Sequence, residues 1–503
     1  GIDVVTLFYK EGGSLTYSSS IMTENGGSYG GIIPGSSVTQ NGLLYYISAQ
    51  DILGFTSVSD TLGASVSFAS GTLTTNSANG SAYSTGIPSD SWRLFSIPAS
   101  LDESGLLQVL DELGPQDNAS WRIFKYDDVS LTYKSNIIDL QEMESYWLYQ
   151  KIEDNLLIST PSGRTGNMQG SMLTMKTGWN FISSPYPFQI AISLDPVQFY
   201  GPITYGVNGE NWSPVVNEMD PWNGYLVYNR TSSAQTIYLD PALENQVLSA
   251  RELHEEGWLV SMEASAGEYS DPINTFGALM LAEDGIEWHD NPEISSPGDG
   301  ISLYFENENI SDYKLTSDIR KFNNSLKSWD MFLKNKTSST VSIDWEIKRN
   351  LQNNFVLKLL DYNTRNIVDL KNSNSLELGN IHSNLDRKFK IIYGEEVEVQ
   401  NHLKNLLSQI PEDFSIIGNF PNPFNPSTII KYSLPQPSEI QIKVFNILGQ
   451  EIFQLINGWQ DFGFYDLEWH GQNTKGEFVP SGVYFILIND GQNIKSHKIM
   501  LLK

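Results

Sequence analysis

Short stretches in which apolar and polar residues alternate recur along the chain, separated by glycine, asparagine, proline and serine. The clearest example lies in residues 414–503, where Ile430, Tyr432 and Leu434 alternate with Lys431 and Ser433. A period of two is typical of a β-strand with one buried face. Strands at a spacing of roughly ten residues, with turn residues between them, indicate β-sandwiches. We therefore predict an all-β, multidomain protein with few short helices.

The first module is predicted to span residues 1–69, and its strongest strand pattern is Gly42–Ala49. It looks like an immunoglobulin-like or fibronectin-III-like module. The chain begins at Gly1 with neither methionine nor a signal peptide, so we expect a processed or truncated start. Residues 70–90 are rich in Ser, Thr, Gly and Asn and are predicted to be a linker.

Residues 26–30 satisfy the G-x-S-x-G pattern of a hydrolase nucleophile elbow. That motif needs a strand before it and a helix after it, whereas Ile32-Ile33-Pro34 follows here. We predict a hairpin turn at this position.

An internal repeat spans residues 91–245, with halves at about 91–165 and 166–245. Trp92–Pro98 parallels Trp179–Pro185, Trp121 parallels Trp212, and Ser145–Tyr149 parallels Gly224–Tyr228. We expect two related β-rich halves packed face to face, with a short helix over Leu101–Leu113 in the first. They resemble the tandem tryptophan-rich modules of secreted bacterial proteins.

Residues 246–396 are predicted to form another β-sandwich, jelly-roll-like or immunoglobulin-like, with strands at Gly257–Ala264, Gly300–Phe305, Thr340–Ile347, Asn354–Leu360 and Lys388–Tyr393. Residues 397–413 are predicted to be a linker or short helix that ends at Pro411. A final domain spans residues 414–503.

Composition excludes several functions. The chain has no cysteine, so it can form neither a disulfide nor a cysteine-based zinc site. Its net charge of −28 repels phosphate backbones and argues against nucleic-acid binding. No run approaches the ~18 apolar residues that a membrane helix needs. The six histidines are scattered and form no catalytic triad that the sequence can place.

Separated motifs in the final domain carry a family resemblance. Phe420–Thr428, the V-F-N-I-L-G-Q-E run, Pro480–Tyr484 and Lys503 occur in the same order as in the C-terminal sorting domain of the type IX secretion system. That domain has an immunoglobulin-like fold related to one in flagellar hook-capping proteins. The motif residues are Pro421, Asn422, Pro423, Phe424, Asn425, Pro426, Gly449, Gln450, Ser481, Gly482, Val483, Tyr484 and Lys503.

The resemblance implies export across the outer membrane of a Gram-negative bacterium, to its surface or the extracellular space. The partner would be the type IX secretion machinery. It also implies that the sorting domain is often cleaved. The alternative is a terminal immunoglobulin-like domain without a sorting role.

Clustered aromatic residues suggest carbohydrate contact, because exposed aromatic faces stack on sugar rings; the candidates are Trp121, Trp147, Trp212 and Trp222. The competing interpretation is that repeated aromatics form the core of each half. We expect Trp212 and Trp222, which are flanked by Asn and Pro, to be the most exposed.

Acidic and amide residues are dense at the start of the third region. Calcium takes oxygen ligands of this type, and the candidates are Asp271, Asn274, Asp284 and Asp290. Their spacing does not match an EF-hand, and a solvated acidic loop is the other interpretation. No other cofactor is indicated.

Two functions of different classes remain. One is a non-catalytic secreted or surface-attached protein: an adhesin, a stalk or an accessory part of a larger exported protein, with self-association or a surface glycan as its binding mode. The other is an exported hydrolase or carbohydrate-binding protein that acts on polysaccharide through paired carboxylates and exposed aromatics.

Overall fold

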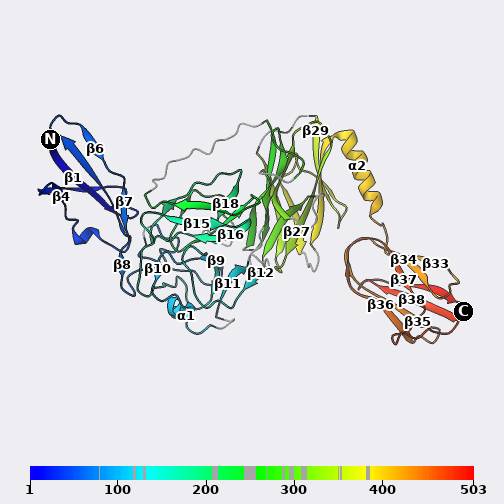
Figure 1. The fold of residues 1–503 in the computed structure, drawn as a ribbon. Coiled ribbons are helices and arrows are strands. Elements are labelled where there is room, and N and C mark those ends of the chain that lie inside the picture. The colour runs from blue at the N-terminus through cyan, green and yellow to red at the C-terminus, as the bar shows by residue number, and fades with distance from the viewer. Residues whose placement is uncertain are drawn as a thin grey trace. The chain divides into compact units, whose positions relative to one another are not determined.

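The computed structural model describes residues 1–78, 80–116, 120–127, 132–206, 213, 215–242, 256–267, 269–285, 289–293, 300–307, 314–348, 351, 354–380 and 386–503 (Figure 1). Strands dominate this described part, and its α-helices are α1, Leu106–Val109, and α2, Glu396–Gln409. The predicted all-β, multidomain fold class is confirmed. The chain forms two compact units, composed mainly of the described residues up to 242 and from 256 onward.

The first unit opens with a sheet of order β2-β1-β5-β6, in which β7 also pairs with β5. Its strands are β1 Ile2–Glu11, β2 Ser18–Ile21, β5 Leu43–Asp51, β6 Thr56–Val58 and β7 Leu62–Ala64. The predicted hairpin is confirmed: β3, Thr23–Asn25, pairs with β4, Ser28–Gly30, around Gly26-Gly27. Both glycines have the positive φ that such a two-residue turn requires.

Residues 70–90 are not a linker, and that prediction is wrong. Leu73, Tyr83 and Ile87 are buried in the core of the repeat's first half. The Tyr83 hydroxyl donates to the Leu94 carbonyl at 2.8 Å, and Ile87 bridges Leu156. The turn-rich composition is real, but the turns wrap the segment around its neighbours instead of leaving it in solvent.

The two halves of the repeat have the same strand arrangement. The sheets have the orders β12-β11-β13-β9 and β16-β20-β18, so β13 and β20 lie between equivalent neighbours. The strands are β9 Trp92–Phe95, β11 Trp121–Asp127, β12 Thr132–Lys134, β13 Tyr146–Gln150, β16 Gly178–Ser183, β18 Phe199–Ile203 and β20 Gly224–Asn229. Smaller strands complete the domain: β8 Ser67–Phe68, β10 Ser100–Leu101, β14 Gly163–Arg164, β15 Ser171–Met175, β17 Ile190–Ala191, β19 Glu218–Met219 and β21 Gln235–Leu239.

Strand register corrects one part of the proposed repeat. Trp92 lies opposite Tyr149, as Trp179 lies opposite Tyr228, so these residues are equivalent. Trp121 lies opposite Gln150, and the residue opposite the equivalent Asn229 is Phe199. Phe199, and not Trp212, therefore occupies the position of Trp121. Trp212 itself lies outside the described residues.

The halves contact one another through reciprocal hydrogen bonds. The backbone N–H of Ser96 donates to the Trp222 carbonyl at 2.9 Å, and that of Ser183 donates to the Met143 carbonyl at 3.1 Å. Since Ser96 is equivalent to Ser183 and Trp222 to Met143, the halves are related by an internal pseudo-two-fold axis. Side chains of both sheets share one apolar core, as expected for face-to-face packing: Trp92, Leu94, Trp147, Tyr200, Ile203, Tyr205 and Leu226.

The helix predicted over Leu101–Leu113 is shorter than expected. Leu101 belongs to strand β10, and α1 is followed by a 3₁₀ turn at Asp111–Leu113. Gly114, with a positive φ, ends this turn. Turn residues at both ends therefore limit the helical segment.

The second unit contains an eleven-stranded sheet of order β30-β29-β32-β27-β25-β26-β23-β22-β28-β31, with β24 paired to β26. Its strands are β22 Gly257–Ala266, β23 Tyr269–Leu279, β24 Asn291–Pro292, β25 Ile301–Glu306, β26 Lys314–Lys321, β27 Lys327–Asn335, β28 Thr340–Ile347, β29 Phe355–Asp361, β30 Ile367–Asp369, β31 Ser375–Asn380 and β32 Arg387–Glu395. Each of the five predicted strands overlaps a strand of this set, namely β22, β25, β28, β29 or β32.

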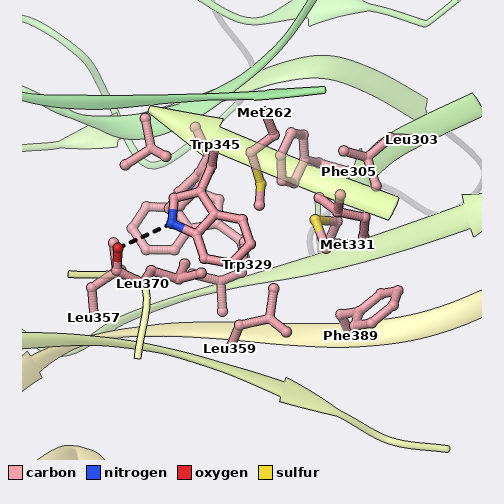
Figure 2. Close-up of a cluster of buried hydrophobic side chains, with 14 of the residues drawn as sticks. Met262, Leu303, Phe305, Trp329, Met331, Trp345, Leu357, Leu359, Leu370 and Phe389 are labelled. Carbon is pink, nitrogen blue, oxygen red and sulfur yellow. Dashed lines mark hydrogen bonds between the residues drawn. The ribbon is translucent and has the colours of Figure 1, made fainter. Parts of the chain in front are cut away.

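This sheet curls around a single core. Strands β22 and β32 are five places apart in the order, which is roughly 24 Å in a flat sheet. Nevertheless, the rings of Trp258 and Tyr393 on these two strands have centroids 4.5 Å apart. Figure 2 shows the interior, where the buried Trp345 Nε1 donates to the Leu370 carbonyl at 3.0 Å.

After α2, a C-terminal domain forms two further sheets, β33-β34-β37 and β36-β35-β38-β39. The strands are β33 Ser415–Phe420, β34 Thr428–Leu434, β35 Ser438–Asn446, β36 Glu451–Gln460, β37 Gly463–Trp469, β38 Gly482–Asn489 and β39 Ile494–Leu501. Both sheets contribute to one core, which includes Ile430 and Tyr432 from the first and Ile442 and Ile486 from the second. The two sheets thus pack as a β-sandwich.

Candidate functional site

The proline-rich loop of the C-terminal domain holds the last strand of the chain. The Asn422 Oδ1 accepts from the backbone N–H of Met500 at 3.0 Å. Phe424 continues the contact, since its N–H donates to the Met500 carbonyl at 2.9 Å and its carbonyl accepts from Leu502 at 3.0 Å. The loop therefore covers one end of the free edge of β39.

Phe424 anchors this loop in the core. Its side chain is 2% exposed, and its ring lies 5.5 Å from that of Trp469. On the other side of the loop, the Thr428 hydroxyl donates to the Pro421 carbonyl at 2.8 Å. The extended course of the loop thus depends on one buried aromatic residue and on polar bonds to its backbone.

The second motif, Pro480–Tyr484, reaches the same end of the chain. The Ser481 Oγ accepts from the backbone N–H of Lys503 at 2.9 Å, and Gly482 pairs with Leu501. Burial raises the pKa of the Tyr484 hydroxyl above its ordinary value, so the hydroxyl stays protonated and donates to the Pro480 carbonyl at 2.8 Å.

The third motif is the turn between β35 and β36. The Asn446 Oδ1 accepts from the backbone N–H groups of Leu448 and Gln450, at 2.9 and 3.0 Å. Gly449 has a φ of +77°, which glycine adopts without strain. Because Asn446 lies opposite Tyr484, this turn is at the end of the sheet where β38 begins and β39 ends.

All the predicted sorting-motif residues therefore belong to segments that meet at one end of the four-stranded sheet. Two participants were not predicted from sequence. The Asn419 Oδ1 lies 3.0 Å from His497 Nε2, and its amide donates to the Thr428 hydroxyl at 2.9 Å. The sequence signal that could have identified Asn419 is a polar residue beside a run of prolines. Side chains must supply hydrogen bonds to the backbone of such a segment.

Three of the four tryptophans proposed for carbohydrate contact occupy the core. Trp121, Trp147 and Trp222 are each 0% exposed. The expectation that Trp222 is among the most exposed is wrong, because it inserts into the core of the opposite half with its ring 5.8 Å from that of Phe95. Trp212, the fourth candidate, lies outside the described residues.

The proposed calcium residues do not gather into one group. Asp290 Oδ1 accepts from the backbone N–H of Ile319 at 2.8 Å, and Asp284 Oδ1 accepts from Lys327 Nζ at 3.1 Å. Asp271 and Asn274 are buried. Within the described ranges, no set of three or more His, Cys, Asp or Glu residues is placed to hold a metal ion, so the calcium hypothesis gains no support.

Comparison with known proteins assigns a class to the C-terminal domain. Residues 419–502 match the secretion system C-terminal sorting domain family. The chain therefore carries a sorting domain, and it is a cargo protein of the type IX secretion system. Such cargo is exported to the cell surface or the extracellular space of a Gram-negative bacterium, and its sorting domain interacts with the type IX machinery.

One solved structure with similarity is that of PorZ, described as an essential bacterial surface component of the type-IX secretion system of Porphyromonas gingivalis. The alignment has 14% identity and a TM-score of 0.14, and it covers 22% of this chain and 14% of that chain. No curated protein matches. Among the described helices, none is long and apolar enough to cross a membrane.

Proposed function

We propose that the modules upstream of the sorting domain act at the cell surface as a non-catalytic adhesive or structural assembly. The observation that carries this proposal is that aromatic residues of the repeat are buried where the two halves meet. Trp147, the most buried of those in the shared core, has its ring 5.1 Å from Tyr205 of the other half and 6.5 Å from Trp92 of its own. Such side chains rigidify the join between halves and are not available to a ligand.

Buried acids have structural partners as well. Asp361 is 2% exposed and forms an ion pair with Arg387, and it also accepts from the Thr364 hydroxyl at 2.6 Å. Asp318 is 1% exposed and pairs with Arg320 at 2.9 Å. A glycosidase pair instead needs two carboxyl groups that face a common cleft at ~5–10 Å.

The export role and the absence of catalysis are tested separately. The full chain and a chain ending at Asp413 are expressed in a bacterium with a type IX system. We expect the full chain to be cut by protease added to intact cells, or to be found in the medium, and the shortened chain to be retained inside. Intact mass of the exported protein then tells whether residues after about Ser415 are removed.

The recovered protein is next incubated with a panel of neutral and acidic polysaccharides. We expect no new reducing ends and no oligosaccharide products by chromatography. Time-dependent product formation from any of them would contradict the non-catalytic assignment while leaving the export role intact.

A further inference from the structure

The hairpin turn that follows β5 in the first module repeats the sequence of a turn in the sorting domain. Residues 51–55 read D-I-L-G-F, and residues 446–450, the third sorting motif, read N-I-L-G-Q. We call residues 51–55 the N-terminal turn and residues 446–450 the sorting turn. In each turn the acid or amide residue ends one strand, and the next strand begins five residues later. The two turns therefore occupy the same place in a β-hairpin.

The two turns also have the same hydrogen bonds. The Asp51 Oδ1 accepts from the backbone N–H groups of Leu53 and Phe55, each at 2.9 Å. The Asp51 N–H donates to the Phe55 carbonyl at 2.9 Å, and Gly54 has a φ of +87°. This is a three-residue hairpin loop that ends in a left-handed glycine. The sorting turn has the same three bonds, at 2.9 to 3.0 Å, and a φ of +77° at Gly449. Both turns thus present their side chains from the same backbone.

The central side chains of both turns are aliphatic and exposed. Ile52 and Leu53 are 68% and 76% exposed, and Ile447 and Leu448 are 72% and 77% exposed. Phe55, which is 73% exposed, adds a third apolar side chain to the N-terminal turn. Glycine, proline, asparagine, aspartate and serine are the usual turn residues. Adjacent large apolar side chains at the tip of a hairpin instead mark an interaction site.

A third turn shows that this backbone does not require aliphatic residues. Residues 473–477 read N-T-K-G-E. The Asn473 Oδ1 accepts from the backbone N–H groups of Lys475 and Glu477 at 2.9 and 3.0 Å, and Gly476 has a φ of +80°. The central residues, Thr474 and Lys475, are polar and exposed. The Ile-Leu pairs of the other two turns therefore serve a contact outside the turn.

The place of the second copy identifies the partner. The sorting turn lies within residues 419–502, which match the sorting domain family, and the partner of that domain is the type IX machinery. A turn with the same central residues, backbone and exposure fits the same complementary surface. Both central pairs are uncharged, so that surface is an apolar groove and not a charged patch.

We propose that the N-terminal turn binds the apolar protein groove of the type IX machinery that also accepts the sorting turn. The first module then carries a second recognition element for the partner of the sorting domain. Two copies of one recognition element strengthen the attachment of a chain to a surface that holds several such grooves. The proposal rests on the export role of the sorting domain.

The test is binding of the purified full chain to outer-membrane fragments from a bacterium with a type IX system and from a strain in which that system is deleted. Ile52→Thr with Leu53→Lys gives the N-terminal turn the central residues of the turn at 473–477, so its hydrogen bonds are kept. We expect binding to the type IX fragments to fall about ten-fold, as ~1.4 kcal/mol of lost affinity gives. Ile447→Thr with Leu448→Lys should cause a similar fall.

The matched control is Leu15→Lys, which replaces a leucine of the first module that is 86% exposed and lies outside the turn. It should bind as the parent chain does. Unchanged binding of the N-terminal turn variant, or an equal loss with Leu15→Lys, overturns the proposal. So does a loss that is equally large on fragments without the type IX system, because the turn would then bind lipid or another membrane component.

Two further measurements separate this proposal from folding and from the sorting role. The double variant of the N-terminal turn should unfold at the temperature of the parent chain, because both residues are exposed. Should it fail to fold, Leu53→Thr alone decides the question, and unchanged binding of that variant overturns the proposed contact. Normal export of a chain without residues 414–503 would instead refute the sorting role.

Discussion

At the pseudo-two-fold axis of the repeat, two equivalent residues approach each other so closely that one of them must lack a side chain. A Cβ on Gly224 would lie 2.4 Å from the Cβ of Ser145. Neither atom can move without its backbone. We predict that Gly224→Ala lowers the free energy of unfolding by about 1–3 kcal/mol, the usual cost of overpacking. Thermal unfolding of the purified chain measures this loss.

The matched control is Gly35→Ala, because nothing lies within 4 Å of that position and its φ is not left-handed. This variant should unfold at the temperature of the parent chain. Adding Ser145→Gly to Gly224→Ala removes the opposing Cβ and should restore part of the stability. If Gly224→Ala leaves the free energy of unfolding unchanged, the two halves do not approach each other this closely.

At the scale of the elements, strand β39 is held by a side chain outside its own sheet, that of Phe424. Phe424→Ala removes a buried ring and should cost about 3–5 kcal/mol. The amides of Leu502 and Met500, which bond to the loop, should then exchange hydrogen faster than those in the middle of β38. The control is Phe420→Ala, which removes a side chain that is 76% exposed beside the same loop. Equal exchange in both variants would contradict the anchoring role of Phe424.

A helix or strand could be predicted from the sequence when the residue pattern that specifies it lies within that element. The alternation of Ile430, Tyr432 and Leu434 follows from the geometry of a single strand, and β34 was predicted correctly. Strand β27 carries the same signal in Trp329, Met331 and Leu333 and was not predicted. The burial of Trp222 depends on a partner half that is distant in sequence, so flanking Asn and Pro indicated the wrong environment.

The candidate site divides in the same way. The sorting motifs could be identified from their order, and with them the export role. Their convergence on the last strand required the register of β38 with β39, which motif spacing does not give. The linker prediction for residues 70–90 failed for the related reason that turn-rich composition does not report what a segment packs against.

For the whole molecule, the uneven distribution of charge predicts how its parts respond to salt. The buried core of the sorting domain is made of residues between Phe414 and Leu501, so this domain should unfold in a transition of its own. That transition should be missing from a chain ending at Asp413. Because residues 1–413 carry −27 and the sorting domain −1, self-repulsion destabilises the upstream modules far more.

Raising the ionic strength from about 0.01 M to 0.15 M shortens the screening length from about 30 Å to about 8 Å. We therefore predict that scanning calorimetry shows the upstream transitions moving to higher temperature over this range, while the sorting-domain transition stays in place. Equal shifts of all transitions would mean that salt acts through something other than net charge. A single transition that is lost as a whole in the shortened chain would mean that the sorting domain does not fold as a separate unit.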